Sequence, residues 1–249
     1  MTQSAPSASL SCAALATRVA ALDCAALRAE FQANGEFIAV ADFLPAAGLA
    51  PLLEALPALE PRVHRNFIPG PKKGGSISRY DLDAHAPAYA DFYRSAALKE
   101  FLEALCGHAL LPCPPDDPHT YALYYYTEGG DHIGWHYDTS YYKGARYTVL
   151  LGLVDDSSCR LEYELFRDDS QHATVSGGTA LAPGMLVVFN GDKLWHRVTP
   201  SKAGERRVAL TLEYVTTLGM HPLRRFMSNM KDAVAYFGFR QVFSRAKRH

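Results

Sequence analysis

Apolar residues recur at the spacing of an α-helix in three segments of the first half of the chain. These segments are residues 13–33, 45–59 and 95–106. The first ends at Asn34-Gly35, a pair that commonly stops a helix. Residues 37–40 form a short strand candidate, and the glycines and prolines of residues 69–75 predict a turn-rich loop. We therefore expect residues 1–115 to form a helical N-terminal part.

The pattern changes after Thr120 to short runs rich in β-branched and aromatic residues. The runs cover residues 121–126, 147–154, 160–166, 185–189 and 208–215. Pairs of glycine, aspartate or asparagine separate them, and no helical period lies between them. Such spacing is typical of an antiparallel sandwich or barrel. It predicts an α+β fold, mainly β, with the barrel core in residues 116–216.

The end of the chain, residues 217–249, returns to a helical and basic pattern. We interpret it either as an exposed helix face or as a lid over a site. No internal repeat or clear linker divides the sequence, and 249 residues with 48% hydrophobic content are enough for one core. We expect a single domain over residues 1–249.

The charged residues nearly balance, with 25 basic and 26 acidic side chains and a pI near 6.8. This balance provides no general attraction to nucleic acid or to an anionic membrane. The five cysteines are odd in number and include no C-x-x-C pair, which argues against a disulfide framework and a thiolate zinc site. We expect a cytoplasmic protein that recognises a small molecule locally.

The most informative segment is Gly134-Trp135-His136-Tyr137-Asp138. On an extended backbone, His136 and Asp138 project to the same face because they are two residues apart. His196 follows a later strand and turn. Two histidines and one carboxylate can occupy one face of an octahedral ferrous ion and leave three positions open. We predict that these three residues bind a metal. For the H-x-D triplet alone, a hydrogen-bonded surface pair is the alternative.

An arginine stands at the head of the last strand of the predicted core. Arg207 shares strand parity with Thr211 and Glu213, so its guanidinium would enter the barrel with them. A guanidinium can hold a carboxylate in fork geometry, whereas a lysine acts only as a point charge. The neighbouring Arg206 is the competing candidate, because a shift of one residue reverses which side chain points inward.

In their order and spacing, these residues resemble the ferrous iron and 2-oxoglutarate-dependent dioxygenases, whose core is a double-stranded β-helix, a jelly-roll or cupin-like fold. The resemblance rests on Tyr126 with the glycine turn after it, His136-Tyr137-Asp138, His196 and Arg207. It implies an enzyme that uses Fe(II), 2-oxoglutarate and O2. It also implies that Arg207 pairs with the distal carboxylate of 2-oxoglutarate and that Tyr126 hydrogen-bonds this cosubstrate. Tyr124 shares the face of Tyr126 and is the alternative for that role, and a barrel-lining aromatic is the other interpretation of Tyr126.

A finer resemblance connects the chain to the group of radical halogenases and hydroxylases of free amino acids such as lysine. It rests on the overall length, the helical N-terminal third, and residues 159–165 and 235–239. Halogenases of that group carry glycine or alanine in place of the metal carboxylate, whereas this chain has Asp138. The resemblance therefore implies a hydroxylase that couples C–H hydroxylation of an amino acid to decarboxylation of 2-oxoglutarate to succinate.

Five residues are candidates for binding the substrate. Glu213 could receive an ammonium group or form a salt bridge at the strand end, and Thr211 lies on the same strand face. Arg79 could bind a substrate carboxylate or lie solvated on the surface. His132 and Trp135 flank the metal motif and could line the entrance, although Trp135 could equally belong to the core.

Three rival functions remain open. The first is an oxygenase that acts on a protein side chain, as prolyl hydroxylases do. The second is nucleic-acid demethylation, against which the neutral charge balance argues. The third is a jelly-roll binding module without catalysis, which would bind neither iron nor 2-oxoglutarate.

Overall fold

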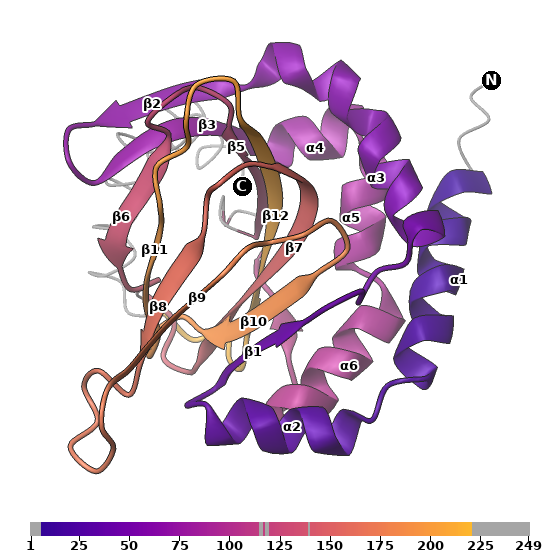
Figure 1. The fold of residues 1–249 in the computed structure, drawn as a ribbon. Coiled ribbons are helices and arrows are strands. Elements are labelled where there is room, and N and C mark those ends of the chain that lie inside the picture. The colour runs from indigo at the N-terminus through magenta and orange to yellow at the C-terminus, as the bar shows by residue number, and fades with distance from the viewer. Residues whose placement is uncertain (1–5, 115–116, 118–119, 139, 221–249) are drawn as a thin grey trace.

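The computed structural model describes residues 6–114, 117, 120–138 and 140–220, in which helices precede a large antiparallel sheet (Figure 1). The helices are α1 (Pro6–Ala20), α2 (Cys24–Ala33), α3 (Ala46–Leu59), the 3-10 turn η1 (Glu60–Arg62), α4 (Arg79–His85), α5 (Pro87–Tyr93) and α6 (Ala96–Cys106). The strands are β1 (Phe37–Val40), β2 (His64–Ile68), β3 (Lys72–Ser78), β4 (Leu111–Pro112), β5 (Tyr121–Tyr126), β6 (His132–His136), β7 (Arg146–Asp156), β8 (Leu161–Leu165), β9 (Val175–Thr179), β10 (Leu186–Asn190), β11 (Trp195–Val198) and β12 (Arg206–Val215).

The first predicted helix is in fact two helices. Asp23 begins α2, because its side chain accepts a hydrogen bond of 3.0 Å from the backbone N–H of Ala26. The prediction of one continuous helix through residues 13–33 is therefore wrong, because the chain leaves α1 after Ala20 and begins α2 after Asp23. The predicted end at the Asn34-Gly35 pair is confirmed. None of the helices in the described part of the chain has the length and apolar composition to cross a bilayer.

The glycine-rich segment at residues 69–75 was predicted to be a loop, but much of it is a strand. It contains the start of β3, which forms a hairpin with β2 through the pairs Ile68–Lys72 and Asn66–Gly74. The backbone pairing stabilises glycine in an extended conformation here, although glycine has a low strand propensity. Helices α4 and α5, which the sequence did not predict, follow directly.

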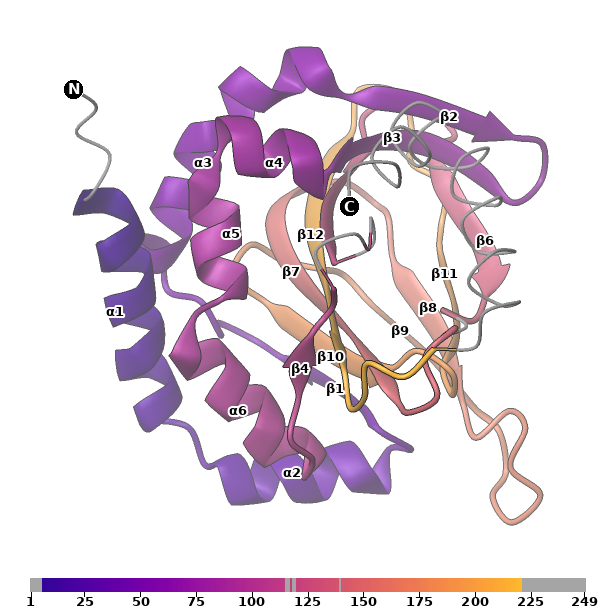
Figure 2. The same cartoon turned by 180° about the vertical axis from the view of Figure 1, so that it is seen from behind.

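The strands form one sheet in the order β1-β10-β7-β12-β5-β3-β6-β11-β8-β9, with β2 beside β3 and β4 beside β12. The sheet curls until its two ends face each other, since the rings of Phe37 on β1 and Tyr163 on β8 have centroids 4.1 Å apart. The six α-helices of the described residues lie along one side of this curl (Figures 1 and 2). The predicted jelly-roll core is confirmed. The predicted lid in residues 217–249 falls almost entirely outside the described residues.

Alternation along the strands divides the buried residues into two cores. The outward side chains of β12, such as Val208 and Leu210, join the core that packs against the helices. The inward residue Ala209 joins a second core inside the curl, with Tyr126 of β5 and Phe189 of β10. The interior of the barrel therefore receives the odd-numbered residues of β12 and the even-numbered residues of β5.

A buried carboxylate holds the turn that leads into β6. The side chain of Asp131 is fully buried and accepts two hydrogen bonds from Arg65, of 2.9 and 2.6 Å. It also accepts the backbone N–H groups of Thr127 and Glu128 at 2.9 and 3.0 Å. Because Gly130 adopts a φ of +86° in this turn, a residue with a side chain would be strained there. The turn fixes where β6 begins and thus where His136 lies.

We expect Asp131→Asn to lower the free energy of unfolding by about 2–4 kcal/mol at pH 7, because it removes one charge of a largely buried pair. Burial acts to raise the pKa of Asp131, but Arg65 and the two backbone donors lower it below the usual value. A carboxylate with a lowered pKa stabilises the fold above its unfolded-state pKa and loses this effect as the pH falls. The difference between wild type and Asp131→Asn should therefore stay nearly constant down to about pH 5 and shrink between pH 5 and pH 3 in urea unfolding, as the pH passes the unfolded-state pKa of about 3.9. The exposed Asp91→Asn variant is the control, and an equal difference at pH 5 and pH 3 would contradict this account.

Candidate metal centre

Three metal-ligating side chains meet inside the barrel at the junction of β6 and β11. His196 lies directly opposite His136 in the strand register, so the two imidazoles project from the same face. Asp138 follows β6 by two residues, with Oδ1 lying 3.4 Å from His136 Nε2 and Oδ2 lying 3.8 Å from His196 Nε2. One ligand atom of each residue lies within 4.8 Å of the others. The structure thus brings together the three residues that the sequence predicted as ligands.

Backbone carbonyl groups fix the orientation of both histidines. His136 Nδ1 lies 2.8 Å from the carbonyl oxygen of Gly134, and His196 Nδ1 lies 3.0 Å from that of Leu194. A carbonyl only accepts hydrogen bonds, so each Nδ1 carries the proton and each Nε2 offers a lone pair. Burial lowers the pKa of His196 to about 4, which keeps its ring neutral at physiological pH. Both rings are therefore oriented as metal ligands.

The carboxylate of Asp138 is ionised and held in place by its neighbours. Burial acts to raise its pKa, but the interactions with His196, His136 and Arg146 outweigh this effect and hold the pKa well below its usual range. Gly191, in the predicted Asn-Gly turn after β10, packs against Asp138. A Cβ atom at Gly191 would lie 2.9 Å from Asp138 Cβ and 3.0 Å from its carbonyl oxygen. A side chain at position 191 would displace Asp138.

Thr148 on β7 supports Asp138 from behind. Its hydroxyl lies 2.9 Å from Asp138 Oδ2 and also 3.1 Å from Glu213 Oε2. Glu213 in turn accepts a hydrogen bond of 2.8 Å from Arg146 Nε. Because Arg146 compensates the charge of Glu213, the single hydroxyl proton of Thr148 can be donated to Asp138. The metal carboxylate is thus connected to a buried ion pair.

Removing the hydroxyl of Thr148 should weaken metal binding without removing a ligand. For Thr148→Val we expect about 10-fold lower affinity for Fe(II), because partners of metal ligands typically contribute 10–100-fold. Thr148→Ser retains the hydroxyl and should bind as wild type does. Anaerobic calorimetric titration measures the effect, with unfolding curves to compare stability. Equal affinity in the valine and serine variants would show that the hydrogen bond does not position Asp138.

A buried guanidinium lies on the inner surface of the curled sheet, on β12 between β7 and β5. Arg207 is only 2% exposed and pairs in register with Tyr126, whose ring centroid lies 4.9 Å from Arg207 Cζ. Among the described residues, no acceptor lies within hydrogen-bond distance of Arg207 Nε or Nη1. Buried charged donors without acceptors are costly, so this position is suited to an anionic ligand. Tyr124 lies on the same inner face of β5 as Tyr126.

Arg206 lies on the opposite face of β12. It pairs with Glu60, and its side chain is 41% exposed. The inner face of the strand instead carries Arg207, Thr211 and the buried Glu213, as the strand parity predicted. The structure thus places one of the two competing arginines inside the barrel and the other on its surface.

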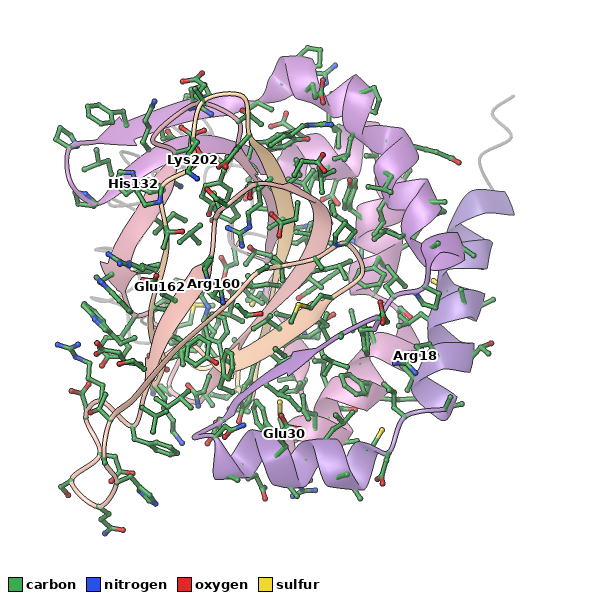
Figure 3. The ribbon with its side chains drawn as sticks, in the orientation of Figure 1. Arg18, Glu30, His132, Arg160, Glu162 and Lys202 are labelled. Atoms are coloured by element: carbon green, nitrogen blue, oxygen red, sulfur yellow. The ribbon has the colours of Figure 1, made fainter. Side chains whose placement is uncertain are left out.

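The other substrate candidates do not all face the interior. Arg79 is buried, donating to Thr120 at 3.2 Å and to Asp83 at 3.3 Å, so its alternative as a solvated arginine is wrong. Trp135 lies on the outer face of β6, where its ring stacks on Trp195 at 6.2 Å. His132 contacts the carbonyl groups of Gly70 and Gly130 beside the β2–β3 hairpin (Figure 3). Trp135 and His132 therefore both point away from the triad. Trp135 alternates with His136, and the register shift between β6 and β11 interrupts the alternation before it, so that Ile133 faces the interior and His132 does not.

Several solved structures have a fold similar to that of this chain. The chain is similar to the non-heme alpha ketoglutarate dependent epimerase SnoN from nogalamycin biosynthesis, with a TM-score of 0.64 and 14% identity over 77% of this chain and 82% of that one. Another structure of SnoN contains Fe3+, alpha ketoglutarate and nogalamycin RO. A prolyl hydroxylase from Trichoplax adhaerens, in complex with a hypoxia inducible factor peptide fragment, has a TM-score of 0.61 and 16% identity over 78% and 89% of the two chains. A prolyl-4-hydroxylase from Pseudomonas putida has a TM-score of 0.59 and 18% identity over 79% and 100%.

The chain has the fold of the Fe(II)/2-oxoglutarate oxygenases. A family model described as Halogenase D matches residues 24–144, a range that includes His136 and Asp138 but ends before His196. A search of curated proteins finds no match to the sequence.

The side chains inside this barrel can bind both a ferrous ion and an organic acid. Two imidazoles and a carboxylate are ligands that ferrous iron accepts on one face. The open donors of Arg207 match a carboxylate. Sequence reasoning missed three residues of this interior, namely Thr148, Arg146 and Lys72. Thr148 lies in a predicted strand run without any motif, Arg146 immediately precedes that run, and Lys72 lies in the segment predicted as a loop.

Proposed function

We propose that the protein is an Fe(II)- and 2-oxoglutarate-dependent hydroxylase of a small molecule, with His136, Asp138 and His196 as the metal ligands. The observation that carries the proposal is the convergence of these side chains in the same barrel interior as the buried Arg207. When bound, iron and 2-oxoglutarate supply the activation of O2 for oxidation of a C–H bond. The protein's own contribution is to orient the ligands and the substrate and to exclude water.

Each inner residue has a role in this proposal. Arg207 would hold the distal carboxylate of 2-oxoglutarate, with Tyr126 or Tyr124 beside it. Thr148 would keep Asp138 in its ligating orientation. Because Asp138 occupies the position where halogenases of the resembling group lack a carboxylate, the proposal is hydroxylation and not halogenation. Glu213 would stabilise the site through Arg146 and Thr148, since its carboxylate already has these partners.

The proposed substrate class is a free amino acid. The Halogenase D match supports the resemblance to the group that contains radical halogenases, and it is this resemblance that implies a free amino acid. The alternative is an oxygenase of a protein side chain, which the fold similarity to prolyl hydroxylases favours. A jelly-roll module without catalysis is the third candidate, and the intact ligand triad argues against it.

A turnover screen distinguishes these candidates. The purified protein is incubated with Fe(II), 2-oxoglutarate and O2, and succinate formation is compared with and without free amino acids or proline-containing peptides. We expect succinate formation that requires all three components and is stimulated by at least one free amino acid. Stimulation by peptides alone would favour the protein oxygenase. Absence of both iron and 2-oxoglutarate binding would leave the non-catalytic module.

A further inference from the structure

Two buried cations lie over two neighbouring tyrosines on the inner face of β5. Arg207 Cζ lies 4.9 Å from the centroid of the Tyr126 ring, and Lys72 Nζ lies 4.9 Å from that of Tyr124. The two basic residues are 2% and 3% exposed, respectively. They reach the interior from different strands, β12 and β3. The barrel thus contains a second cationic position that its sequence motifs did not indicate.

The strand register places Lys72 on the inner face. Lys72 pairs with Ile133, whose side chain packs against the interior core, whereas the next residue, Lys73, pairs with His132 on the outer face. Lys73 accordingly donates to the carbonyl oxygen of Gly129 at 2.7 Å, and its side chain is 31% exposed. Two consecutive lysines therefore have opposite environments, one inside the barrel and one at its surface.

The wall around Lys72 is polar as well as aromatic. Ser76 on β3 pairs with Tyr124 and is buried, as is Asn66 on β2, whose amide donates to the Ser76 hydroxyl at 3.3 Å. A tyrosine face stabilises an ammonium group without neutralising its charge. An ammonium group is also a compact donor that binds a carboxylate as a point charge. The strand register thus directs Lys72 into the barrel, where its Nζ lies over the ring of Tyr124.

The metal and Arg207 together can bind both carboxylates of the proposed cosubstrate, so Lys72 is not needed for 2-oxoglutarate. The keto and adjacent carboxylate oxygens of 2-oxoglutarate are those that a metal can chelate, and Arg207 matches its distal carboxylate. We propose that Lys72 binds a further carboxylate inside the barrel, that of the substrate, so that the substrate is an acid such as a free amino acid. This inference rests on the proposed function, because it assumes that Arg207 serves 2-oxoglutarate.

Pairs of free amino acids and their carboxamides test the inference on the full-length protein. The protein is loaded with Mn(II), a redox-inert replacement for iron, and with saturating 2-oxoglutarate, and binding is measured by calorimetry. For wild type we expect at least one amino acid to bind about 30-fold more tightly than its amide, the effect of one desolvated charge pair. Lys72→Met should remove this preference, Lys72→Arg should retain it, and Lys73→Met should behave as wild type.

The outcomes separate the two possible sources of the carboxylate. If Lys72→Met instead weakens 2-oxoglutarate binding about 30-fold or more, the carboxylate at Lys72 belongs to the cosubstrate. If Lys72→Met retains both the acid preference and the 2-oxoglutarate affinity, or if wild type never prefers an acid to its amide, the inference is wrong. Failure of wild type to bind Mn(II) and 2-oxoglutarate at all would instead contradict the proposed function.

Discussion

An Asp138→Ala variant is expected to lose ferrous iron binding and, with it, all coupled hydroxylation. Asp138 is the only carboxylate among the three converging ligands of the described interior. In chloride-free buffer, alanine leaves two imidazoles and no anionic ligand, so the charge of the ion is not compensated and the three-ligand face is incomplete. Since residues that merely support a ligand contribute 10–100-fold, loss of the ligand itself should lower Fe(II) affinity by more than about 100-fold. Anaerobic titration with Fe(II) and mass spectrometric detection of succinate measure both effects.

The matched control for this variant lies in the same region but outside the triad. Asp168 is exposed and accepts a hydrogen bond from Tyr137, the residue between His136 and Asp138. Asp168→Ala should therefore bind iron as wild type does. Full coupled hydroxylation by Asp138→Ala would show that the ligand assignment is wrong. Equal losses in both variants would instead point to a general disturbance of the loop.

Replacing Arg207 with methionine should selectively weaken binding of 2-oxoglutarate. The guanidinium is buried, and two of its nitrogens are without an acceptor among the described residues. Loss of a buried charged partner typically costs about 2–5 kcal/mol, so the dissociation constant should rise about 30-fold or more. Fe(II) affinity should remain unchanged, because Arg207 is not one of the converging ligands. Titration of the iron-loaded protein with 2-oxoglutarate under anaerobic conditions measures the change.

Arg206→Met is the control for Arg207→Met. The two residues are neighbours with identical side chains, but Arg206 pairs with Glu60 at the surface. Its loss should change 2-oxoglutarate affinity by less than about 3-fold, as surface ion pairs contribute little. The reverse pattern, with the larger effect in Arg206→Met, would contradict the assignment of Arg207.

The alternation of side chains along strands was the most reliable basis for predicting which residues face the barrel interior. The strand at Tyr121–Tyr126 has the predicted bounds, and its even-numbered tyrosines face the interior. Strand parity likewise grouped Arg207, Thr211 and Glu213 on one face. These predictions succeed because alternation is a local property of extended backbone, which the sequence specifies directly.

Features that depend on distant partners could not be predicted in the same way. The glycines before Ser76 indicate a loop, but pairing with β2 and β5 makes this segment a strand and brings Lys72 inside. Thr148 becomes a support for Asp138 only because β7 and the end of β6 meet in the folded barrel. Similarly, Trp135 is adjacent to His136 in the sequence, yet alternation places it on the outer face, where Trp195 stacks on it.

The most direct test of the central claim is an anaerobic calorimetric titration of the wild-type protein, first with Fe(II) and then with 2-oxoglutarate. The structure predicts one Fe(II) ion per chain and one 2-oxoglutarate per iron, with little 2-oxoglutarate binding before the metal is added. A folded protein that shows no heat of binding with Fe(II), or that binds 2-oxoglutarate equally well without it, would contradict the proposal that these side chains form an oxygenase metal centre.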